Sequence, residues 1–354
     1  MRDFYLFTVI IYSLLILLFL LFVLILYFAI HREESDLDKI AWQHSVAVVI
    51  VGVVASEEVE DGLEAMTYEF EKGLDKAGYR NYMIDELIKA KAAFSGSSTS
   101  HLKSLYGRLN LDIDSFRKLH SLKWHIKAKG IRELGAMEQT RYRKEIFWLA
   151  NDKHELVRNE AQGAMVSFFG WSGLSFLDVI EHQMSQWHQV QLLDKLKYVK
   201  PDTFEELIPW LESSNVSVIV FAIKLATLYN CHDVYQNVAK CLQSSNNQVK
   251  LCALEYLRLM PQADTFDQMI SNYYAESTVY KLAVISSLKD IGSENEITFL
   301  VNELNDPNND IKAAAAGSIS VLHPLGNGFF KTYLFATAHP WKEIFFQITN
   351  KHIA

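Results

Sequence analysis

Two histidine–glutamate pairs are the residues of this chain that come closest to a metal site. His154 precedes Glu155, and Glu181 precedes His182 in the reverse order. Imidazole and carboxylate groups both bind iron and zinc, but a site needs several such ligands to converge. The zinc motif HExxH is absent, because a leucine, a valine and an arginine follow Glu155. We therefore predict no metal site, and an enzyme or metal protein stays only as an alternative.

The sequence also contains no motif for a catalytic nucleophile or for phosphate binding. The chain has no nucleophile elbow around a Ser or Cys, no P-loop and no GxGxxG. Its three cysteines, Cys231, Cys241 and Cys252, are odd in number and lack CxxC spacing. They are typical of small core residues in a reducing compartment rather than of a disulfide framework. We predict no catalytic residue, no cofactor, no small-molecule substrate and no enzymatic activity.

A basic stretch from Arg117 to Lys129 is the most suggestive surface, and we expect it to be one helix. Its cations fall opposite an apolar stripe formed by Phe116, Leu119, Leu122 and Ile126. A solvated helix face is one interpretation, and contact with anionic lipid head groups or an acidic partner is the other. The residues predicted for such a contact are Lys118, Lys123, His125, Lys127, Lys129 and Arg132.

Charge is distributed unevenly along the chain. The formal net charge is -8, yet residues 101–145 hold eleven Lys and Arg against five Asp and Glu. An acidic chain is a poor match for a clamp on nucleic acid, whose phosphates are bound mainly by Lys and Arg. We predict no nucleic-acid partner.

The start of the chain predicts a membrane anchor. From Phe4 to Ile30 no side chain carries a formal charge. As a helix this stretch would extend about 40 Å, enough to cross a hydrocarbon core of about 30 Å with some tilt. A cleaved signal peptide is the alternative, but its apolar region would be shorter and followed by a small-x-small site. We expect one span over residues 4–30, with the rest of the chain in the cytoplasm because of its free cysteines.

Residues 40–55 allow more than one interpretation. The run from Val46 to Val54 is apolar and rich in β-branched residues, so it is compatible with a buried helix, a strand or a short second membrane segment. We expect helices that pack on the first repeat. The predicted organisation is an anchor over 1–31, a juxtamembrane helical region over 32–115 and a repeat region over 116–354.

The repeat is the strongest signal in the sequence. An apolar or bulky residue recurs about every 31 residues, and the residue four positions later is often Gly or Ala. The first column is Ile126, Val157, His188, Val218, Val249, Val279, Ile311 and Trp341, and the second is Gly130, Ala161, Leu192, Ala222, Ala253, Ala283, Ala315 and Phe345. Turns rich in Asn, Ser and Asp precede several of these segments. The pattern predicts helix pairs, and hence an all-α fold.

A turn of Asn, Ser and Asp before V-x-x-x-A, repeated at this interval, resembles HEAT repeats of the short type named after phycobilisome lyases. The resemblance covers roughly residues 120–350 and implies a right-handed α-solenoid that serves as a scaffold for other proteins. The whole arrangement also looks like bacterial membrane-anchored HEAT-repeat proteins that accompany envelope glycosyltransferases. His188 with Leu192 departs from the pattern, and a distortion there would widen a groove beside Trp187. Trp341 with Phe345 suits a terminal capping repeat.

Overall fold

The computed structural model describes residues 14–25, 42–56, 59, 67–326, 329 and 340–350. Within these ranges the chain forms helices and no strand, so the predicted all-α class is confirmed. The chain divides into two compact units, Met1–Phe168 and Phe169–Ala354. The boundaries expected after residues 31 and 115 stay predictions.

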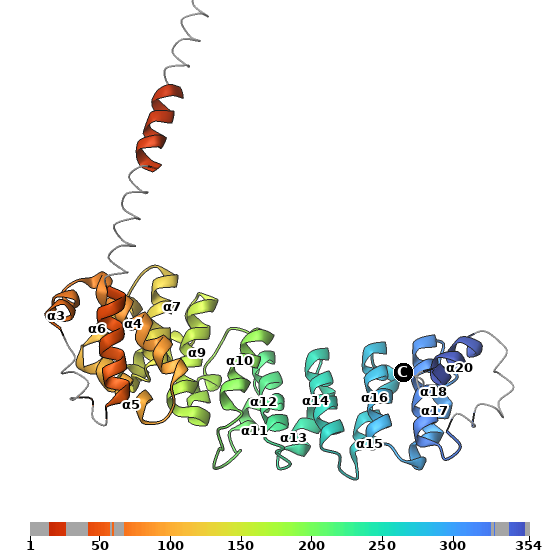
Figure 1. Cartoon of the computed structure of the whole chain (residues 1–354). Helices are drawn as coiled ribbons and strands as arrows, with labels where there is room; N and C mark the ends of the chain where they lie inside the picture. The colour runs from red at the N-terminus through yellow and green to blue at the C-terminus, as the bar shows by residue number, and fades with distance from the viewer. Residues whose placement is uncertain are drawn as a thin grey trace, which may run out of the picture. The chain divides into compact units, whose positions relative to one another are not determined.

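The predicted membrane span lies partly outside the described residues. Residues 14–25 form a helix of exposed Leu, Ile, Phe and Val side chains (Figure 1). Among the residues that the structure describes, none of the helices combines the length and apolar composition that crossing a membrane requires.

Residues 42–55 are a helix packed into the first unit, which answers the question that the sequence left open. Val46, Val49 and Val53 lie on one face of this helix and are fully buried. They share a core with Phe70, Tyr79 and other side chains from the helices that follow. Those helices are α3 (Tyr68–Leu74), α4 (Ala77–Ala93), α5 (Ser97–Arg108) and α6 (Leu111–Leu119).

The rest of the first unit consists of helical hairpins. Helix α6 pairs closely with α7 (Trp124–Ala136). A Cβ atom at Gly130 would lie 2.6 Å from the carbonyl oxygen of Ser115, so the close approach of these two helices requires glycine. The short helix η1 (Thr140–Tyr142), α8 (Arg143–Leu149) and α9 (Glu155–Phe169) follow.

In the second unit, long helices lie side by side in chain order, α10, α12, α14, α16 and α18 (Figure 1). Shorter helices and 3₁₀ turns connect them. The elements are η2 (Gly170–Asp178), α10 (Gln186–Leu196), α11 (Leu207–Leu211), α12 (Val216–Leu228), α13 (Tyr235–Lys240), η3 (Cys241–Gln243), α14 (Asn247–Leu259), α15 (Thr265–Ile270), η4 (Tyr273–Ala275), α16 (Thr278–Ile291), η5 (Glu294–Glu296), α17 (Ile297–Glu303), α18 (Asn309–Leu322) and α20 (Trp341–Asn350).

A regular series of N-caps fixes where the long helices begin. The capping residues recur at the interval of the predicted repeat and are Ser185, Asn215, Asn246, Ser277 and Asn308. Each side chain accepts a hydrogen bond from a backbone N–H in the first turn of its helix, which would otherwise lack a partner. The third helical residue after each cap is buried, so the cap also sets which face packs.

This series corrects one member of the predicted repeat. In α16 the third residue after Ser277 is Tyr280, which is buried, whereas Val279 is 61% exposed. Four residues later Val284 is buried and Ala283 is only partly buried. The expected pair Val279 and Ala283 is therefore shifted by one position, and the corrected spacing is more regular than the predicted one.

The last predicted repeat differs in a similar way. Helix α20 begins at Trp341 and packs against α18. Ile344 is buried there, and Trp341 is only partly buried. The side chain of Phe345 lies outside what the structure describes.

Candidate functional site

The basic stretch from Arg117 to Lys129 is not one helix, which corrects the prediction. Helix α6 ends at Leu119, a turn follows, and α7 begins at Trp124. The apolar spacing predicts Leu122 on the buried stripe because this spacing runs on through the turn. In the structure it is fully exposed, since the chain reverses there to pack Gly130 of α7 against α6.

Three of the six predicted contact residues form ion pairs inside the first unit. The Lys118 ammonium lies 2.7 Å from both carboxylate oxygens of Glu133, which is buried. Lys127 pairs with Asp152 at 3.0 Å, and Lys129 pairs with Asp85 at 3.1 Å. These cations stabilise contacts between helices.

The other three predicted residues stay exposed. Lys123 lies at the start of α7 and Arg132 on its outer side, and neither forms an ion pair in the described part of the chain. His125 is also exposed, with its ring edge-on to the Trp124 ring at a centroid distance of 5.4 Å. The structure therefore does not gather the six residues into one charged face.

Of the histidines singled out in the sequence, His154 and His188 pack against other residues, whereas His182 is exposed. His154 stacks on Trp124, with ring centroids 4.2 Å apart and an interplanar angle of 8°. His188 is buried at the third position of α10. Within the described ranges no three His, Cys, Asp or Glu side chains are grouped so that they could hold a metal ion.

A groove across three consecutive long helices of the second unit is a candidate binding site. It encloses about 840 Å³ and is lined by side chains of α10, α12 and α14. The lining residues are Gln186, Leu193, Ile223, Lys224, Thr227, Leu228, Gln248, Leu251, Cys252 and Glu255. They lie on the side of these helices that faces away from the buried third positions, so sequence patterns for buried residues do not reveal them.

Exposed apolar side chains extend the groove along the same faces. On α10, Val190 is four residues after Gln186 and three before Leu193, and it is 50% exposed. On α14, Leu259 is four residues after Glu255 and 49% exposed. Side chains four apart share one helix face, so the apolar lining continues beyond the groove at both positions.

Five of the ten lining residues are polar, and the two charged ones, Lys224 and Glu255, are held by neighbours. Lys224 donates a hydrogen bond of 2.9 Å to the side-chain oxygen of Gln189, and Glu255 pairs with Arg258. Burial raises the pKa of the Cys252 thiol, and Glu255 adds to the effect, while Lys224 opposes it. A protonated thiol is a poor nucleophile. The groove therefore offers a mainly apolar binding surface with one cation and one anion.

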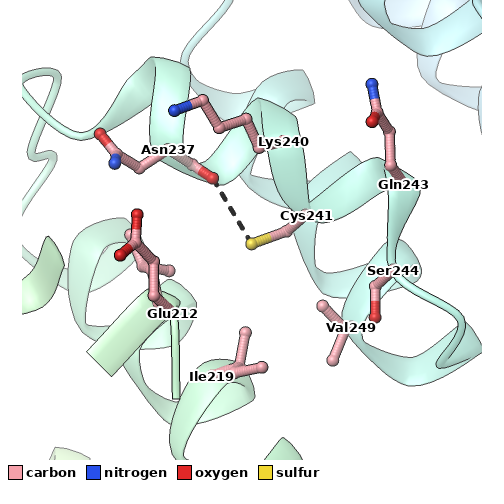
Figure 2. A pocket seen from close by; sticks show the side chains of 9 residues that line it. Glu212, Ile219, Asn237, Lys240, Cys241, Gln243, Ser244 and Val249 are labelled. Carbon is pink, nitrogen blue, oxygen red and sulfur yellow. Dashed lines mark hydrogen bonds between the residues drawn. The ribbon is translucent and has the colours of Figure 1, made fainter. Parts of the chain in front are cut away.

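A smaller pocket of about 250 Å³ lies where α11, α12, α13 and α14 meet (Figure 2). The Cys241 thiol points into it and donates a hydrogen bond of 3.5 Å to the carbonyl oxygen of Asn237. Burial raises the pKa of this thiol to about 11, with a further contribution from the charge of Glu212. Cys241 thus serves packing rather than covalent chemistry.

A comparison with protein-family models finds no match for this chain, and a comparison with curated proteins finds none either.

Proposed function

We propose that the protein is a membrane-anchored, HEAT-like α-solenoid scaffold, of right-handed superhelical sense, which binds a protein partner beside the membrane without catalysis of its own. The regular series of N-caps supports the repeat architecture. Stacked pairs of helices bury a continuous core between neighbours and leave an extended face for binding. A partner that belongs to an envelope glycosyltransferase complex follows from the family resemblance alone.

The groove on α10, α12 and α14 carries the proposal. Apolar side chains from three successive long helices line a shallow channel, and Val190 and Leu259 lengthen it. Such a channel suits an amphipathic helix, whose apolar side chains recur at every third or fourth position. Lys224 and Glu255 would fix the direction of that helix through charges of opposite sign.

The membrane anchor rests on the sequence of residues 4–30. None of their side chains carries a formal charge, and burying them in hydrocarbon is favourable by about 0.3 to 0.6 kcal/mol for each Leu, Ile, Phe or Val. We place the remainder of the chain on the cytoplasmic side, where its cysteines stay reduced.

Affinity capture with the full-length protein in mild detergent tests the groove. Val190→Asp and Leu259→Asp introduce charges at exposed positions, so they leave the fold intact. We expect each to reduce the recovered partner at least tenfold. Val321→Asp is the matched control, because Val321 occupies on α18 the position that Leu259 occupies on α14, ten positions after the buried third helical residue.

Equal recovery with Leu259→Asp and Val321→Asp would remove the groove as the binding site. A partner that is lost with neither aspartate likewise rejects the groove, whereas the absence of any stoichiometric partner would overturn the scaffold proposal itself.

A further inference from the structure

Two hairpin turns of the first unit lie against each other. The turn between α6 and α7 ends at Trp124, whose ring stacks on His154 in the turn between α8 and α9. The ion pair between Lys127 and Asp152 joins the same two segments at 3.0 Å. The two turns therefore form one tip.

Large apolar side chains are exposed on this tip. Leu122 is fully exposed, Trp124 is 44% exposed and Leu156, at the second position of α9, is 49% exposed. Two corresponding turns of the second unit instead have Ser213-Ser214-Asn215 and Ser244-Ser245-Asn246, although Trp187 and Val279 are exposed at the second positions of α10 and α16. Burial of a large apolar side chain such as leucine is worth about 1.5–3 kcal/mol, so the tip is a favourable place for an apolar contact.

Two cations flank the apolar group. Lys123 lies between Leu122 and Trp124, and Lys153 precedes His154. Both are exposed, and neither forms a salt bridge in the part of the chain that the structure describes. Tryptophan and leucine beside such lysines form the composition that is found at the interface of an anionic bilayer.

The covalent connection keeps this unit near the proposed anchor, on which the inference rests. The helix over 42–55 belongs to the core that also contains Met137 at the end of α7. Only the short segment 31–41 separates Ile30 from Trp42. Even fully extended, it spans roughly 40 Å.

We infer that the tip formed by Leu122, Lys123, Trp124, Lys153 and Leu156 docks on the anionic surface of the membrane. Leu122 and Trp124 enter the interface between head groups and acyl chains, while Lys123 and Lys153 contact the anionic head groups. The docked tip orients the first unit on the bilayer, which a single anchor helix cannot do.

The test uses the full-length chain, reconstituted into vesicles of phosphatidylcholine alone or of phosphatidylcholine with phosphatidylglycerol, each with and without brominated acyl chains. The signal of Trp124 is the fluorescence of the wild type minus that of Trp124→Phe. We expect a blue-shifted signal, quenched by the brominated lipid, only in the anionic vesicles. Lys123→Gln and Lys153→Gln should each reduce the ratio of docked to undocked tip about fivefold, since one lysine near such a surface contributes on the order of 1 kcal/mol.

One further variant tests the apolar contact of the tip, and another serves as the control. Leu122→Asp changes a fully exposed side chain and should abolish the quenching without unfolding the first unit. Lys240→Gln removes an exposed cation of the second unit and should leave the quenching unchanged. A Trp124 signal that is unquenched, or equal in neutral and anionic vesicles, overturns the inference. If Trp124 became shielded only when a protein is bound, and not by lipid, the tip would be a binding site for that protein instead.

Extraction with alkaline carbonate separates this inference from the proposed anchor. A chain that resists extraction but shows no quenching of Trp124 is anchored without a docked tip. A chain that is extracted, yet shows quenching in anionic vesicles before extraction, docks through the tip without an anchor.

Discussion

Lys118 in α6 donates hydrogen bonds to both carboxylate oxygens of Glu133 in α7, at 2.7 Å each, and so connects the two helices. The Glu133 side chain is 1% exposed and also accepts a hydrogen bond from Ser115. A carboxylate so far from water needs a cation and hydrogen bonds to remain charged. Lys118 therefore joins α6 to α7, and its charge is not available to a lipid or a partner.

Removing Lys118 should destabilise the first unit strongly. Lys118→Ala leaves the buried Glu133 carboxylate with Lys129 as its one remaining nearby cation, at 3.7 Å. Loss of one partner of a buried pair costs about 3–5 kcal/mol. Lys123→Ala, at an exposed cation of the following turn, should change the free energy of unfolding by less than about 0.5 kcal/mol. Urea unfolding of the full-length protein in detergent, followed by tryptophan fluorescence, measures both. Equal effects of the two variants on the free energy of unfolding would contradict a stabilising role of Lys118 between α6 and α7.

The N-cap of α14 offers a test of the helix boundaries. Asn246 accepts hydrogen bonds from the backbone N–H groups of Gln248 and Val249. Asn246→Ala should reduce the free energy of unfolding by about 1 kcal/mol, and Asn246→Asp should preserve it, because aspartate caps equally well. Ser245→Ala, at the residue before the cap, should be neutral. A loss of stability with Ser245→Ala as large as with Asn246→Ala would show that α14 begins earlier.

Most of the fold follows from the sequence because the repeat is local. Each repeat is recognised from three features within one short stretch of chain: an N-cap, a buried third helical residue and a small residue four positions later. The cap satisfies backbone N–H groups, and the two spaced residues form the face of the helix that packs. The shift of the copy in α16 has a clear cause. Residue type alone favours Val279 as the buried residue, whereas Ser277 fixes the helix start so that Tyr280 faces inward. Tyrosine is tolerated there because its hydroxyl donates to the carbonyl oxygen of Met269 at 3.1 Å.

The candidate sites were harder to predict, since they depend on contacts between distant residues. Lys129 pairs with Asp85, which lies 44 positions earlier, and a list of cations cannot show which ones have such partners. The groove needs three helices to be placed side by side before its lining is visible. Leu122 was misplaced for the same reason, because apolar spacing does not show where a chain reverses.

Substitutions in α14 and α16 test the corrected register directly. Val249 is buried, so Val249→Ser removes apolar contacts and buries a hydroxyl, which should cost about 2–3 kcal/mol. Val279→Ser changes an exposed side chain and should alter stability by less than about 0.5 kcal/mol. Thermal or urea unfolding compares the two variants. If Val279→Ser destabilised the protein as much as Val249→Ser, then Val279 would be the buried residue of α16, as the sequence predicts, and the correction to Tyr280 would be wrong.

The Cys241 thiol predicts how stability depends on pH. Burial, aided by the charge of Glu212, raises its pKa to about 11 in the folded protein, against about 8.5 in an unfolded chain. The folded state therefore binds more protons between these values, and the contribution of this thiol to stability is lost as pH rises from about 8.5 to 11. The free energy of unfolding should fall more steeply over that range in the wild type than in Cys241→Ala.

At pH 8 the folded thiol should also react with iodoacetamide at least about 100-fold more slowly than in urea, because the thiolate is the reactive form. Parallel pH curves for the two proteins, or rapid alkylation of folded Cys241, would contradict a buried, protonated thiol.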